Sequence, residues 1–258
     1  MSMLDEWFWL WTPICASILL SMILVPLGER VLQRGVVFAD IAIAQWAALG
    51  VLVGSQLVWL RTWEDSFPAL SFSGLGFALL ASWLVHLILR YFAAHREAMI
   101  GTLYVAGASL ATISVSHDPH GAQALAATLN GDLLWTSSSQ LFVLLPIGIA
   151  VGLWLRLATQ TKERCFLPLF ALAITVAVEV AGVYVVFATL ISTPLMICRI
   201  AQRPLSLAIG CSILAHFIGL VLAAWLDYPV GPSVVLSSIV FAMFVLMAIN
   251  MHKLYRIG

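Results

Sequence analysis

Residues 166–198 read FLPLFALAITVAVEVAGVYVVFATLISTPLMIC, an apolar run that contains one charged side chain, Glu179. A helix needs about 20 apolar residues to cross the hydrocarbon core of a bilayer. The run is too long for one crossing and too short for two full crossings joined by a turn. Gly182 and Pro194 lie inside it, and both residue types interrupt helices. We therefore expect two short, broken membrane helices between residues 166 and 198.

The whole chain has the composition of an integral membrane protein. Of its 258 residues, 62% are hydrophobic and 9% are charged, whereas about 25% of residues are charged in a soluble domain. Its mean hydropathy is +1.05. The apolar runs are continuous and do not alternate with polar residues, which argues against β-barrel strands and favours helices. The sequence predicts an all-α, polytopic transmembrane bundle, with a single domain over residues 1–258.

The apolar runs predict eight or nine membrane-spanning helices, and the charge distribution favours nine. Basic residues concentrate on the cytoplasmic side of membrane proteins. With nine crossings only Arg61 lies on the wrong side, whereas with eight Arg199 and Arg203 would be translocated. The amino terminus is then outside and the carboxyl terminus is cytoplasmic. The predicted spans are residues 8–28, 36–60, 69–89, 98–115, 138–156, 166–182, 183–198, 205–226 and 232–250.

The chain lacks the motifs of several classes of protein. A P-loop that binds ATP needs GxxxxGK[ST], and the two lysines, Lys162 and Lys253, lie outside any such motif. HExxH and GxSxG are also missing. The formal net charge is +0, which leaves no basic surface for nucleic acid. We expect neither an enzyme nor a nucleic-acid-binding protein, no bound cofactor in this chain, and four packed cysteine thiols.

Polar groups inside the apolar runs are the candidate functional residues, because an ionised side chain costs about 2.5–3.5 kcal/mol to insert at the bilayer centre. Asp40 lies about 9 Å beyond Arg34 along the second span, and Gln45 follows slightly more than one turn later. Asp40 is either a ligand in a cation pathway or a hydrogen-bonding group between packed helices. Glu179 is either a ligand or proton site or a buried structural acid.

The histidines carry weaker signals. His216, in the eighth span, is either a metal ligand or a ring satisfied by a backbone carbonyl, as is usual for a lone histidine among apolar residues. On the outer side, His117, Asp118 and His120 offer nitrogen and oxygen donors to a metal ion. Asp118 is also the expected N-cap of a short external helix, which Gly131 would end.

Three blocks resemble, in unchanged order, the ATP-binding cassette permeases for zinc, manganese and iron(II), the ABC-3 type of membrane subunit. Residues 33–54, QRGVVFADIAIAQWAALGVLVG, resemble the second-helix motif. Residues 97–115, EAMIGTLYVAGASLATISV, followed by PHGAQALAATLNGDLLW, resemble a glycine-rich helix and a later leucine-x-glycine-aspartate-x-leucine segment. Residues 180–199, VAGVYVVFATLISTPLMICR, resemble a helix that runs into a proline and an arginine. The matching positions are Asp40, Gly101, Gly107, Leu129, Gly131, Asp132, Leu133, Gly182, Pro194 and Arg199.

The resemblance implies the permease subunit of an importer of divalent metal ions in a bacterial plasma membrane. It implies a homodimer around a central pathway, two cytoplasmic ATPase subunits that bind ATP, and an external metal-binding protein. The transported ion would be zinc or manganese, or else iron. On this hypothesis Asp40 and Glu179 line the path, and Gln45 and His216 are further candidate ligands.

Two departures from the family pattern bear on this function. Many members have a histidine one turn after the aspartate, where this chain has Ala44 followed by Gln45. The cytoplasmic segment that would dock on an ATPase is short, at residues 156–164. Three alternatives stay open: a permease for a metal chelate, as for siderophores or cobalamin; a proton-coupled carrier that uses Asp40 and Glu179 as proton sites; and a scaffold without transport.

Overall fold

The computed structural model describes residues 10–33, 39–56, 71–91, 95–131, 133–198 and 205–255. Over these residues the chain is helical and has no strand, which confirms the predicted all-α class. The α-helices are α2 (Trp11–Gln33), α3 (Ala39–Gln56), α5 (Phe72–Tyr91), α6 (Arg96–Val115), α7 (Gly121–Asn130), α8 (Ser138–Leu155), α9 (Thr159–Cys198), α10 (Leu205–Leu226) and α11 (Val230–Tyr255). A 3₁₀ turn, η2 (Leu133–Trp135), precedes α8.

Within the described residues, 6 helices are long and apolar enough to cross a membrane, namely α2, α5, α6, α8, α9 and α10. The apolar part of α11, Val230–Val245, is shorter, and α3 carries the polar residues Asp40 and Gln45. The helices therefore fit a membrane bundle. The nine crossings and the outward amino terminus stay predictions.

The helix α9 doubles back at Gly182, whose φ of 78° and ψ of 162° are not helical. Near its start, Glu163 lies 3.8 Å from Arg30 of α2. Further along α9, the backbone of Leu190 packs against Gly28, which is also on α2. A straight helix would separate Glu163 from Leu190 by about 40 Å, so the two arms run in opposite directions. The expected break is confirmed, although the first arm begins at Thr159 and not at residue 166.

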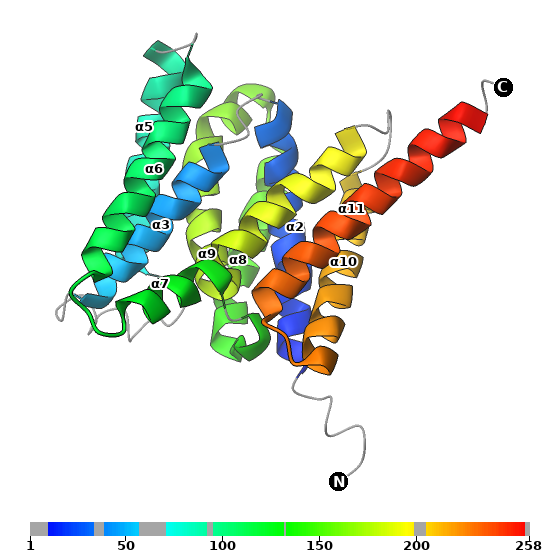
Figure 1. Ribbon diagram of the computed structural model, residues 1–258. Helices are drawn as coiled ribbons and strands as arrows, with labels where there is room; N and C mark the ends of the chain where they lie inside the picture. Colours follow the sequence, from blue (N-terminus) through cyan, green and yellow to red (C-terminus); the bar gives the residue numbers. More distant parts are fainter. Residues whose placement is uncertain are drawn as a thin grey trace.

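The two arms of α9 form the centre of the bundle (Figure 1). The core is contributed mainly by α2, α3 and α9, and it includes the fully buried residues Leu20, Ile23, Leu24, Leu27, Ile43, Ile174 and Leu190. In Figure 1, α3, α5 and α6 lie on one flank of this centre and α10 and α11 on the other. The helix α7 lies across the lower end of the bundle.

The end of α7 and the break in α9 pack directly on each other. Gly131, which follows α7, has φ 67°, and Gly182 has φ 78°. A Cβ atom on either glycine would overlap the backbone of the other segment. Both positions therefore need glycine for conformation and for space.

The start of α7 differs from the prediction, whereas its end agrees with it. Oδ1 of Asp118 accepts a hydrogen bond from the backbone N–H of His120 at 2.9 Å. This Asx turn uses the carboxylate before the helix starts, and the helix begins only at Gly121. The expected N-cap role of Asp118 is therefore wrong. Cys165 also departs from expectation, because its thiol is exposed, while Cys15 and Cys211 are half-buried.

Candidate functional site

Asp40 lies in the first turn of α3 and is 1% exposed. Its Oδ1 accepts a hydrogen bond from the backbone N–H of Ile41 at 2.8 Å. Its Oδ2 is buried and has no hydrogen-bond partner among the described residues. A buried polar atom without a partner is uncommon in a native protein and calls for an explanation. The free oxygen keeps both interpretations of Asp40 open. It fits a cation-ligand role better than a packing role, because a hydrogen bond between packed helices would occupy this oxygen.

Gln45 lies on the same helix and lines a cavity of about 260 Å³. The residue is 4% exposed. The cavity is bounded by α3, α6, α7 and the second arm of α9, through Ile41, Gln45, Tyr104, Ala108, Thr112, Leu125, Leu129, Val183, Tyr184 and Phe187. Its polar groups are thus one amide, two phenols and one threonine hydroxyl.

Gly107 allows α6 to approach α3 closely beside this cavity. A Cβ atom at Gly107 would lie 2.7 Å from Cδ1 of Trp46 and 3.5 Å from Cγ of Gln45. The indole Nε1–H of Trp46 donates to the backbone carbonyl of Leu103 at 2.9 Å. The two helices are therefore fixed to each other immediately next to the Gln45 side chain.

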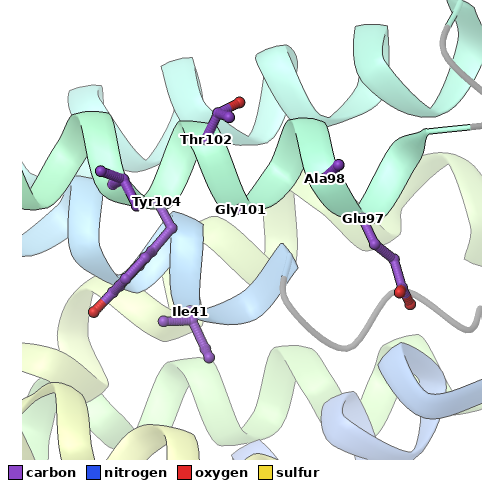
Figure 2. Close-up of a pocket in the computed structure, with 7 residues that line it drawn as sticks. Ile41, Glu97, Ala98, Gly101, Thr102 and Tyr104 are labelled. Carbon is purple, nitrogen blue, oxygen red and sulfur yellow. The ribbon is translucent and has the colours of Figure 1, made fainter.

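A second cavity, of about 630 Å³, adjoins the first along α6. Ile41 and Tyr104 line both cavities, and the second extends to Glu97 in the first turn of α6. Figure 2 shows the Tyr104 ring and Ile41 on the same side of α6, with Glu97 at the other end of the pocket. From Thr112 to Glu97 the helix rises about 22 Å, so the two pockets together follow most of the length of α6.

Glu179 lies outside both cavities, near the break in α9. Its carboxylate accepts from the backbone N–H of Ser71, at 3.0 Å to Oε1 and 3.2 Å to Oε2. Ser71 immediately precedes α5, and its Oγ accepts from the N–H of Gly74 at 3.0 Å. The carboxylate therefore lies at a helix N-terminus, where the exposed N–H groups and the helix dipole favour a negative charge.

His216 is fully buried between α10 and the second arm of α9. Its Nε2 lies 2.8 Å from Oγ1 of Thr189, which donates its own hydrogen to the carbonyl of Val185 at 2.7 Å. A hydroxyl has one hydrogen to donate, so Thr189 accepts from Nε2–H of His216. Nδ1 then lacks a partner among the described residues. The partner of His216 is a hydroxyl and not the expected backbone carbonyl.

The structure does not bring the four candidate residues into one site. Val185 and Thr189 lie on the face of the second arm opposite the residues that line the Gln45 cavity, so His216 is outside that cavity. Within the described ranges, no group of three or more His, Cys, Asp and Glu side chains could hold a metal ion. His117 and His120 are exposed on the turn before α7. The metal-ligand assignments therefore stay predictions.

Sequence reasoning overlooked Tyr104, Thr112, Tyr184 and Glu97. A signal was present on α6, because Glu97, Gly101, Tyr104, Ala108 and Thr112 recur at intervals of three and four residues. Such spacing places charged, polar and small residues on one face of a helix. In an apolar run, this face of the helix is also typical of residues that pack inside the bundle.

Comparison with known proteins gives one family match and a similar solved fold. Residues 155–249 match the model of the ABC 3 transport family. No curated protein matches the sequence. Among solved structures, the fold is similar to that of PsaBC from Streptococcus pneumoniae in complex with Fab, with a TM-score of 0.74 and 16% identity over 94% of this chain and 92% of the other. The resemblance to the ABC 3 transport family is thus confirmed by the family match over residues 155–249.

Proposed function

We propose that this chain is the membrane-spanning permease subunit of an ATP-binding cassette importer for divalent metal ions. The match of residues 155–249 to the ABC 3 transport family carries the proposal. The fold supports it, because a solved complex with the same fold aligns with almost the whole chain. The buried free oxygen of Asp40 supports a cation as cargo, since an unpaired carboxylate oxygen is the type of ligand that divalent ions use.

The chain would act with partners that supply energy and cargo. ATP would bind to two cytoplasmic ATPase subunits, a second copy of the permease would complete a central pathway, and an external protein would deliver the ion. Alternating access would follow from tilting of the two permease copies. The location would be a bacterial plasma membrane.

The turn between α8 and α9 would be the contact with an ATPase, and its two sides are joined by hydrogen bonds. The indole Nε1–H of Trp154 donates to the carbonyl of Lys162 at 2.9 Å. In return, Nζ of Lys162 donates to the carbonyl of Leu155 at 3.3 Å and lies 4.8 Å from the centre of the Trp154 ring. A turn held in this way would pass a movement of the ATPase to α8 and α9 without a long docking helix.

The test is metal uptake by vesicles that contain the permease with its copurifying ATPase. We expect Asp40→Asn to remove most ATP-dependent uptake, because the amide has lost the charge that attracts the ion. The matched control is Asp227→Asn, since Asp227 is exposed in the turn before α11 and has φ 57°, a conformation that asparagine tolerates. Full uptake in the Asp40 variant would contradict the assignment. Uptake driven by a pH gradient without ATP would favour the proton-coupled carrier. If a metal chelate competed for uptake and the free ion did not, the chelate permease would be favoured.

A further inference from the structure

We propose that the groove between α10 and α11 binds one acyl chain of a membrane phospholipid, in the leaflet at the end of the bundle where α10 meets α11. The inference goes beyond the proposed function, because it concerns the surface that faces the lipid and does not depend on the cargo.

Two rows of large apolar side chains form the walls of the groove, which has a volume of about 430 Å³. In each row the side chains recur every four residues and so lie on one face of the helix. The rows are Ile218, Leu222 and Leu226 on α10, and Leu236, Val240 and Phe244 on α11. The three residues of the second row are 62%, 64% and 71% exposed, so the rest of the chain leaves this side of the groove open.

Small residues hold the two helices close together between these walls. A Cβ atom on Gly219 would lie 2.5 Å from Oγ of Ser237, which lines the groove. Ser237 donates its hydroxyl hydrogen to the carbonyl of Ala215 at 2.9 Å. Ser233, which also lines the groove, donates to the carbonyl of Pro229 at 2.9 Å. Because both hydroxyl hydrogens are used and the described lining residues carry no charge, the groove suits a hydrocarbon chain.

Exposed aromatic side chains mark the membrane boundary at one end of the groove. Trp225 in the last turn of α10 and Tyr228 in the turn before α11 are both exposed. Trp11, at the start of α2, is exposed at the same end of the bundle, where α2 begins and α10 meets α11 in Figure 1. Tryptophan and tyrosine are enriched at the boundary between membrane and water. The groove therefore begins at the level of the lipid headgroups.

The length of the groove fits one leaflet. From Ser233 to Phe244, α11 rises about 16 Å, and half of a hydrocarbon core of about 30 Å is about 15 Å. The groove thus covers most of one leaflet and ends near the bilayer midplane. This is the path of a single acyl chain whose headgroup stays at the boundary.

The chemistry of the groove favours a phospholipid over a second protein helix. Contacts between membrane helices are enriched in small residues, whereas here the small residues are already used within the chain and the open side presents large ones. Tyr228 lines the boundary end of the groove, and its phenol hydroxyl can donate to an ester or phosphate oxygen. A phospholipid supplies both the apolar chain and these acceptors.

The experiment titrates the permease, purified with its ATPase in dodecyl maltoside, with a phosphatidylcholine that carries a diazirine at the end of one acyl chain. Light couples the probe to nearby residues, and mass spectrometry of peptides locates the label. We expect labelling around Phe244 that saturates at about one probe per permease, as for a single site. The exposed face of α8, with Phe142 and Ile149, should show only weak labelling that does not saturate.

Two variants test the groove itself. Val240→Trp fills it and should abolish the saturable labelling, whereas Met243→Trp is the matched control, because Met243 is as exposed as Val240 but lies outside the lining. Tyr228→Phe removes one hydrogen bond and should raise the half-saturating probe concentration about two- to tenfold. Tyr91→Phe, at the exposed end of α5, should leave it unchanged.

Two results would overturn the inference. The first is equal labelling of α8 and α11, or labelling of α11 that neither Val240→Trp nor Tyr228→Phe changes, which would identify ordinary lipid contact. The second is disulfide formation between two copies that carry Val240→Cys, without saturable labelling, which would place a second copy of the chain at the groove.

Discussion

The backbone N–H of Ser71 points at the carboxylate of Glu179, 3.0 Å from Oε1 and 3.2 Å from Oε2. This contact joins residues that are 108 positions apart in the sequence. It ties the first arm of α9 to the start of α5, three residues before the break at Gly182. The structure thus supports an anchoring role for Glu179 at the point where α9 reverses.

Substitution of Glu179 separates an anchor from a metal ligand. Glu179→Ala leaves the Ser71 N–H without its acceptor, and we expect a loss of about 1.5–3 kcal/mol in the free energy of unfolding. Glu179→Gln keeps a carbonyl oxygen in place and should retain most of the stability and the metal uptake. Thermal unfolding in detergent and vesicle uptake are the two measurements. Normal stability with abolished uptake in Glu179→Gln would instead identify a ligand.

The reversal at Gly182 should not tolerate a side chain. Gly182→Ala places a Cβ against the backbone of Gly131 at a positive φ, and strain of this kind costs about 1–3 kcal/mol before the clash is added. We expect a large fall in the melting temperature and in the yield of folded protein. Gly210→Ala is the matched control, because nothing lies within 4 Å of its Cβ position. Equal behaviour of the two variants would contradict the fold-back.

The sequence predicted this reversal because the break is local. An apolar run that is too long for one span and contains a glycine must be interrupted near that glycine. The partner of Glu179 could not be predicted, because no local pattern places Ser71 beside it. The same limit applies to the cavity: Gln45 stood out as a polar residue in an apolar helix, whereas Tyr104 and Tyr184 gained meaning only once α6 and α9 were placed around it.

The contact between His216 and Thr189 predicts a single tautomer. Because Thr189 donates its hydrogen to Val185, we expect a neutral His216 ring to carry its hydrogen on Nε2. Nitrogen-15 NMR of protein labelled at its 6 histidines would show this, and His216→Phe would identify the signal. Thr189→Val should abolish the preference. Thr175→Val is the control, since Thr175 is buried and bonds to the carbonyl of Ala171 on its own helix. A ring protonated on Nδ1 would contradict the geometry.

The membrane orientation can be tested with two thiols at opposite ends of the bundle. Cys165 is exposed near the start of α9, at the end where Arg30 pairs with Glu163, which the distribution of basic residues places in the cytoplasm. His117 is exposed on the turn between α6 and α7, and α7 lies across the other end of the bundle in Figure 1.

The experiment compares two proteins that each have one cysteine. The first keeps Cys165 and lacks the other native cysteines, and the second lacks all native cysteines and carries His117→Cys. In intact cells, a membrane-impermeant maleimide should label the cysteine at 117 and should reach Cys165 only after permeabilisation. Equal labelling of the two proteins in denaturant controls for reactivity. The opposite pattern in intact cells would reverse the orientation and, with it, the side on which an ATPase could bind.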